Sequence, residues 1–127
     1  MRVNRYVERV YDLFLSKGEI RIEEFRFAFS STGQIGTLET TVRFWDGSML
    51  FASETLEAKG LSFVKTDYAY HFQDSENNLI FRYDNAAHHP NISTHPHHKH
   101  TPGNVGPATP PNLWEVLQEA EAHLYPE

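Results

Sequence analysis

Apolar residues recur at intervals of three and four near both ends of the chain. In the first segment they are Val3, Val7, Val10, Tyr11, Phe14 and Leu15, followed by Gly18. In the last segment they are Leu113, Val116, Leu117, Ala120 and Leu124, preceded by Asn112 and with Glu115 in the reciprocal capping position. This spacing is typical of amphipathic helices. It predicts one helix over residues 3–17 and a second that begins after the Asn112 cap.

Between these segments the period of the apolar residues falls to two, which is typical of β-strands with one buried face. The predicted strands cover residues 25–29, 38–45, 49–54, 63–72 and 79–84. Turn sequences separate them, and the strongest of these is the Asp46-Gly47 pair, a two-residue hairpin signal. The polar stretch 56–61 has no clear pattern and predicts neither a helix nor a strand.

The segment after the last predicted strand is rich in histidine, and residues 101–111 are dense in proline and glycine. Such a composition does not sustain a helix or a central strand, so it predicts a crossing loop. The element order predicts an α+β fold, with an antiparallel β-meander of about five strands. An N-terminal and a C-terminal helix pack this meander, and an irregular histidine-rich loop precedes the last helix. At 127 residues, we expect a single domain spanning 1–127.

Composition excludes several classes of protein. The chain has no cysteine, which rules out disulfides, thiolate catalysis and cysteine-ligated metal centres. No apolar run approaches the roughly 20 residues that span a bilayer, and the first residues lack the apolar core of a signal peptide. We therefore expect a cytoplasmic protein with no membrane partner.

The net charge of −6 has the wrong sign for a protein that binds nucleic acid over its whole surface. The distribution is more informative than the total. Residues 82–101 carry two basic side chains against one acidic, whereas the segments before and after them are both acidic. Segment 82–101 is therefore where an anionic ligand is favoured.

Six of the eight histidines lie within thirteen residues. They are His88, His89, His95, His97, His98 and His100. Because the unperturbed pKa of histidine is close to neutral, imidazoles here can act as general acid and base. Alternatively, His95 with His97, or His98 with His100, can offer two nitrogens to one metal ion, since residues i and i+2 of an extended chain point the same way. A solvated loop that is merely rich in histidine is the third interpretation.

Four motifs of the middle and later parts of the chain are distinctive. They are Trp45-Asp-Gly-Ser48, Tyr68-Ala-Tyr-His-Phe72, Phe81-Arg-Tyr-Asp-Asn-Ala-Ala-His-His-Pro90 and Thr94-His-Pro-His-His-Lys-His100. Together they resemble the TumE family of bacterial toxins from toxin–antitoxin systems. The likeness covers most of residues 40–100, and Ala87 departs from the proline usual in the family. The resemblance implies a small cytoplasmic toxin that is held in check by a separate antitoxin, a DNA-binding protein of the TumA kind.

Ribonuclease toxins built from a helix and an antiparallel sheet offer an architectural analogy, which alone assigns no chemistry. Cleavage of RNA without a metal requires a base, an acid and cations that stabilise the phosphorane. We expect a metal-independent ribonuclease with no cofactor. The predicted acid and base come from His97, His98 and His100, and the predicted phosphate-binding cations are Arg82 and Lys99.

Residues on the preceding strands are expected to support the reaction. Asp84 or Tyr83 is expected to orient an imidazole, and His71 is expected to join the site if the loop folds back over its strand. Two other hypotheses stay open. One is a zinc site made by His95, His97, His98 and His100, and the other is a non-catalytic module whose loop binds a partner protein. Whether the chain forms a homo-oligomer is left undecided by the sequence.

Overall fold

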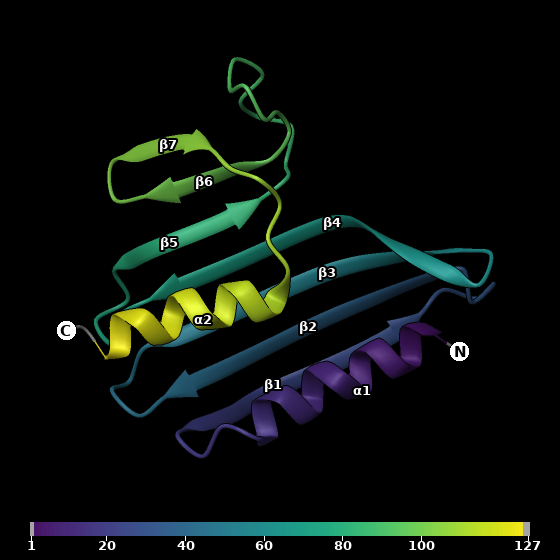
Figure 1. Cartoon of the computed structure of the whole chain (residues 1–127), viewed down its shortest axis with the longest axis horizontal. Coiled ribbons are helices and arrows are strands. Elements are labelled where there is room, and N and C mark those ends of the chain that lie inside the picture. The colour runs from purple at the N-terminus through teal and green to yellow at the C-terminus, as the bar shows by residue number, and fades with distance from the viewer. Residues whose placement is uncertain (1, 126–127) are drawn as a thin grey trace.

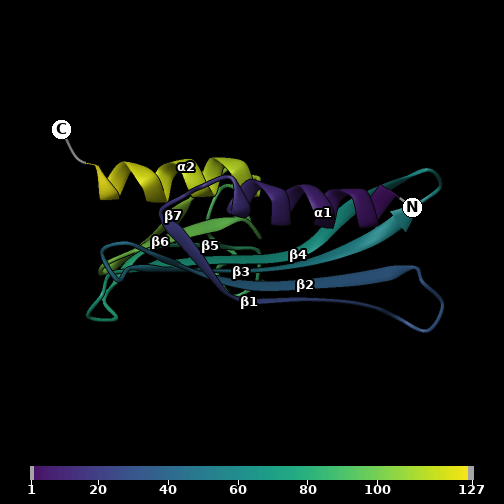
Figure 2. The same ribbon diagram turned by 90° about the horizontal axis from the view of Figure 1, so that it is seen from below.

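The computed structural model describes residues 2–125 and contains one antiparallel sheet with a helix at each end of the chain. The helices are α1 (Arg2–Leu15) and α2 (Leu113–Leu124). The strands are β1 (Ile20–Phe29), β2 (Ile35–Phe44), β3 (Met49–Lys59), β4 (Ser62–Gln73), β5 (Leu79–Asp84), β6 (His98–Thr101) and β7 (Asn104–Pro107). Both helices lie on the same face of the sheet (Figure 2), so no helix within residues 2–125 covers the other face. The predicted α+β fold is confirmed.

Every strand pairs in an antiparallel manner with the next one along the chain, which makes the sheet an uninterrupted meander (Figure 1). The sheet has seven strands where the sequence predicted about five. The two additional strands, β6 and β7, form a hairpin within the region predicted as irregular and crossing loop. Gly103, with φ of 74°, makes the turn between them, and Pro107 ends the edge strand β7, where a missing N–H is tolerated.

Other boundaries also differ from the predictions. The unassigned stretch 56–61 mostly continues β3, which reaches Lys59 before Gly60 turns the chain with φ of 59°. Helix α1 ends at Leu15, two residues before the predicted boundary. The start of α2 matches the prediction, because the Asn112 side chain accepts from the Glu115 amide and the Glu115 carboxylate accepts from the Asn112 amide. Among the described residues, no helix is both long and apolar enough to cross a membrane.

The core lies between the two helices and one face of the sheet, which we call the helix face. Alternate residues of the strands point into it, as the period of two predicts. The largest fully buried apolar side chains are Tyr70, Phe14, Phe72, Phe81, Leu38, Leu50, Leu56, Leu113 and Leu117. We call the opposite face of the sheet the open face. It carries the intervening residues of the same strands.

One carboxylate lies inside this core. Glu54 of β3 is 1 % exposed, and it accepts hydrogen bonds from the hydroxyls of Tyr6, at 2.5 Å, and of Tyr70. The Lys65 ammonium lies 3.7 Å from the carboxylate and donates to the backbone oxygen of Pro111, at 2.9 Å. Burial, followed by the charge of Glu54 and the hydrogen bond to it, raises the pKa of Tyr6. These contacts tie α1, β3, β4 and the chain before α2 together.

A candidate site on the open face of the sheet

The alternation of side chains along β6 divides the most histidine-rich motif between the two faces. Strand β6 pairs with β5 so that His98 lies opposite Asp84 and His100 lies opposite Arg82. All four of these side chains share the open face, because cross-strand partners point the same way. Lys99 lies opposite Tyr83 and points to the helix face. The expectation that one pocket holds both the imidazoles and the amine of Lys99 is therefore wrong.

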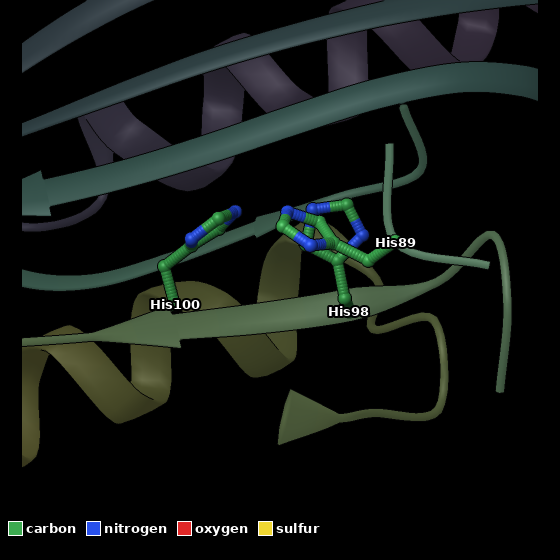
Figure 3. Close-up of side chains that lie close together, drawn as sticks. All are labelled: His89, His98 and His100. Atoms are coloured by element: carbon green, nitrogen blue, oxygen red, sulfur yellow. The ribbon is translucent and has the colours of Figure 1, made fainter. Parts of the chain in front are cut away.

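A third imidazole reaches the open face from the segment between β5 and β6. The His89 ring lies 4.9 Å from the His98 ring and 5.7 Å from the His100 ring, measured between centroids. The His98 and His100 rings are 4.8 Å apart. Figure 3 shows His98 and His100 rising from the same strand, with His89 approaching from a separate segment. We call His89, His98, His100, Arg82 and Asp84 together the open-face cluster.

Asp84 is the central anion of the open-face cluster. Its Oδ1 atom lies 2.8 Å from His98 Nε2 and accepts from the Ala86 amide at 3.0 Å. Its Oδ2 atom accepts from Arg82 Nε at 3.0 Å and lies 3.8 Å from His100 Nε2. One carboxylate at the end of β5 therefore contacts a guanidinium and two imidazoles.

His98 is held more firmly than the other two imidazoles. It is 2 % exposed, and its Nδ1–H group donates to the backbone oxygen of Pro96 at 2.9 Å. Because a carbonyl oxygen only accepts, this bond fixes the proton on Nδ1 and directs Nε2 toward Asp84. His89 and His100 are only half-buried. They are the two imidazoles of the open-face cluster that a ligand can reach.

The open-face cluster lines a hollow of about 470 Å³, together with Ser53, Ala69 and the start of the loop after β5. Burial lowers the pKa of His100, and the positive forms of His98, His89 and Arg82 lower it further, against the opposing charge of Asp84. The hollow therefore favours an uncharged His100. Its nitrogen lone pair is then free to accept a proton or to bind a metal ion.

Two residues predicted for the site lie elsewhere. The Lys99 ammonium contacts Glu119 of α2 at 2.7 Å and lies 4.9 Å from the centroid of the Tyr83 ring. Burial opposes its charge, but the contacts with Glu119 and Tyr83 outweigh burial and raise the pKa of Lys99. His97 stacks on the buried Tyr68 ring, and its Nδ1 atom lies 2.9 Å from the Tyr68 hydroxyl. Neither side chain joins the open-face cluster.

Three further residues were predicted for the site. Tyr83, the alternative to Asp84, points to the helix face, where its hydroxyl donates to Glu119 Oε1 at 2.6 Å. His71 of β4 lies opposite Arg82, and Arg82 Nη1 is 3.5 Å from His71 Nδ1, so His71 adjoins the open-face cluster. His95 is exposed, and its Nδ1 atom lies 3.2 Å from the backbone oxygen of His89. Within residues 2–125, the grouping with metal-ligand spacing is His89, His98 and His100. It shares only its last two members with the predicted zinc set.

His89 is the residue of the open-face cluster that sequence reasoning missed. Strand alternation predicts that His98 and His100 share a face, but it says nothing about a residue nine positions earlier in a loop. The loop folds back through short turns, in which the Ile92 amide donates to the His89 oxygen at 3.3 Å and the His95 amide donates to the Ile92 oxygen at 3.0 Å. No spacing in the sequence predicts such a course.

Comparison with known proteins identifies one family. The family model described as Toxin TumE matches residues 10–124, which is most of the chain and includes every member of the open-face cluster. No curated protein and no solved structure matches the chain. The family confirms the resemblance drawn from the four motifs, and it implies an antitoxin partner. The chain belongs to the TumE family and is a toxin of a toxin–antitoxin system.

Proposed function

We propose that this toxin cleaves RNA on the open face of its sheet, in a metal-independent reaction carried by the open-face cluster. The observation that supports this best is the convergence of three imidazoles and a guanidinium around one hollow. Imidazoles exchange protons near neutral pH, and a guanidinium binds phosphate oxygens. The hollow therefore combines the base, the acid and the cation that such a reaction needs.

Arg82 is the proposed phosphate-binding group. Its side chain is 36 % exposed, and its Nε atom is tied to Asp84. This bond uses one edge of the planar guanidinium and fixes its direction, which leaves further N–H groups to donate to phosphate oxygens. His71 lies beside the guanidinium on the neighbouring strand, with its Nε2 atom 2.9 Å from Gln73 Oε1 and its Nδ1 atom 3.5 Å from Arg82 Nη1.

His89 and His100 are the proposed pair for proton transfer, because they are the accessible imidazoles of the open-face cluster. One of them takes the proton of a ribose 2′-hydroxyl while that oxygen attacks the adjacent phosphorus. The bond from phosphorus to the 5′ oxygen then breaks, and the other imidazole, in its protonated form, gives its proton to the leaving oxygen. The products are a 2′,3′-cyclic phosphate and a 5′-hydroxyl end. His98, held between Pro96 and Asp84, acts as the positioning residue.

The open face also offers a surface for a nucleic-acid strand. Phe51 of β3 lies opposite His71 and is half-buried on this face. An aromatic ring in such a position stacks on a base, and stacking contributes about 1 to 3 kcal/mol per base in single-strand binders. The acidic charge of the remaining chain limits nonspecific adhesion to nucleic acid, so binding depends on the local contacts of the open face.

The experiment that tests this function maps RNA ends in cells that express the chain without its antitoxin. We expect new 5′-hydroxyl ends and growth arrest with the wild-type chain, and neither with the His89→Ala/His100→Ala double variant. The matched control is His123→Ala, since His123 is exposed on α2 and packs near Phe72 and Phe81 of the helix face. New 5′-hydroxyl ends that persist in the double variant overturn the proposal.

Two further comparisons use the same assay. Lys99→Met retains cleavage if the open face acts alone, and it loses cleavage if Lys99 binds phosphate as the sequence predicted. Cellular RNA that stays intact with the wild-type chain as well as with the double variant, together with loss of antitoxin binding in the double variant, supports the rival hypothesis of a non-catalytic interaction module. We further propose that the antitoxin is a DNA-binding protein and that the toxin works in the cytoplasm, where RNA is its substrate.

A further inference from the structure

We propose that His89, His98 and His100 form a binding site for one zinc ion, and that zinc at this site switches RNA cleavage off. One nitrogen from each imidazole lies within 4.8 Å of the other two. Zinc–nitrogen bonds of about 2.0 to 2.1 Å place tetrahedral ligand atoms about 3.4 Å apart. Small rotations of the half-buried His89 and His100 rings, which Figure 3 shows beside His98, are enough to close this gap.

The hydrogen bond made by Nδ1 of His98 is of the kind that metal-binding histidines make with their second nitrogen. Histidines that bind metals donate their second N–H group to a carbonyl or carboxylate, which fixes the ring and leaves the other nitrogen as the ligand. His98 donates Nδ1–H to the Pro96 oxygen at 2.9 Å, while its Nε2 atom lies 2.8 Å from Asp84 Oδ1, a contact that a zinc ion would replace. A zinc ion would therefore meet a nitrogen whose direction is already set.

Asp84 supplies the negative charge that a dication needs in a partly buried site. Its carboxylate contacts His98 Nε2 at 2.8 Å and lies 3.8 Å from His100 Nε2. It can bind the ion as a fourth ligand or compensate its charge from beside the imidazoles. The bond between Arg82 and Asp84 Oδ2 holds this carboxylate in place and corresponds to the outer contacts that orient ligating carboxylates.

The type of ligand atom selects the kind of metal ion. Magnesium and calcium prefer sites made of oxygen atoms, whereas imidazoles suit zinc, copper, nickel and iron. This trio offers three nitrogens and no thiolate, because the chain has no cysteine. It differs from the zinc set that the sequence suggested, in which His95 and His97 take part. Zinc is the ion that we test.

The effect of zinc on RNA cleavage follows from the lone pairs of the imidazole nitrogens, and this step rests on the proposed function. A nitrogen that binds zinc cannot take up a proton at the same time. His89 and His100 therefore serve either as the proton-transfer pair or as zinc ligands. Zinc bound to the open-face cluster removes both the base and the acid from the reaction.

The binding test uses the full chain, purified without a histidine tag and freed of metal by a chelator. We expect titration calorimetry with zinc chloride to give one ion per chain. We expect His89→Ala and His100→Ala each to weaken binding by at least about 10-fold, as the loss of a ligand must cost at least as much as the loss of an outer contact. His123→Ala is the matched control, because His123 is exposed on α2 and lies outside the trio and its hollow. Cobalt chloride should give the intense visible absorption of a four-coordinate site with the wild type and not with the double variant.

The outcomes separate this inference from the proposed function. Zinc that binds the wild-type chain no better than the His89→Ala/His100→Ala variant overturns the inference, whatever the chain does to RNA. A chain that binds zinc but yields no new RNA ends in the end-mapping assay supports the site and overturns the proposed function. If the chain both binds zinc at this site and cleaves RNA, added zinc should lower cleavage of a model RNA and a chelator should restore it. If RNA cleavage instead requires zinc, the zinc site is supported but its proposed inhibitory role is overturned.

Discussion

Replacing Tyr6 with phenylalanine tests whether the buried carboxylate of Glu54 depends on hydroxyl donors from another element. The Tyr6 hydroxyl donates to Glu54 Oε1 at 2.5 Å and joins α1 to β3. A hydrogen bond to a charged group contributes about 1.5 to 3 kcal/mol to stability. Since Glu54 is 1 % exposed, water cannot replace the lost donor. We expect Tyr6→Phe to lower the free energy of unfolding by about 1.5 to 3 kcal/mol.

The matched control is Tyr11→Phe on the same helix. The Tyr11 ring packs edge-on against Phe25, with centroids 5.0 Å apart, and Tyr11 is 40 % exposed. Within the part of the chain that the structure describes, no hydrogen bond joins its hydroxyl to another side chain, so the change should stay within about 0.5 kcal/mol. Urea unfolding followed by circular dichroism measures both variants, with an unchanged m-value as the sign of a pure stability effect.

A double-mutant cycle shows whether the charge of Glu54 causes the effect. In a Glu54→Gln background the acceptor is a neutral amide, so Tyr6→Phe should cost only about 0.5 to 1.5 kcal/mol. An equal cost in both backgrounds would refute the assignment to a charged hydrogen bond. A cost for Tyr6→Phe as small as that for Tyr11→Phe would refute the role of the hydroxyl itself.

Four other variants test local features of the fold by the same unfolding measurements. Burial, followed by the charge of Asp84, raises the pKa of Tyr68 from 10.0 to about 12. Unfolding therefore releases a proton above pH 10, the wild-type chain loses stability as pH rises toward 12, and Tyr68→Phe should flatten this loss. Gly47→Ala should cost about 1 to 2 kcal/mol, because φ is +87° and a Cβ atom would meet Ser75 Cβ at 3.0 Å, whereas Gly18→Ala, with open space around it, should be neutral or stabilising. Asn112→Ala should cost about 1 kcal/mol by removing the cap of α2.

The parts of the fold that the sequence predicted are those whose apolar period is long and regular. Both helices and the first five strands follow such patterns, and the Asp46-Gly47 pair marks its hairpin correctly. Strands β6 and β7 contain four residues each, in the sequences His-Lys-His-Thr and Asn-Val-Gly-Pro. They have almost no apolar residues to alternate, so local sequence cannot reveal them. Their extended form depends on pairing with β5, which is a tertiary effect.

The missed strand also explains the errors in the predicted site. A loop allows adjacent residues to converge, so His97, His98, Lys99 and His100 were expected to act together. A strand sends neighbours to opposite faces. Once residues 98–101 are known to pair with β5, alternation assigns Lys99 to the helix face and unites His98 and His100 with Arg82. The sequence could therefore have predicted most of the open-face cluster, but not His89.

Strand alternation also separates the residues that hold the fold from those proposed to act on RNA. In β4 and β5, Tyr70 and Phe81 fill the core while His71 and Arg82 occupy the open face. Substitutions on the open face can therefore remove activity without emptying the core. His98 is the exception, because it is buried and bonded to Pro96 and Asp84, so its loss would disturb both stability and chemistry. For this reason His89 and His100, which are half-buried and whose side chains make no hydrogen bond within residues 2–125, are the residues whose replacement reports most directly on function.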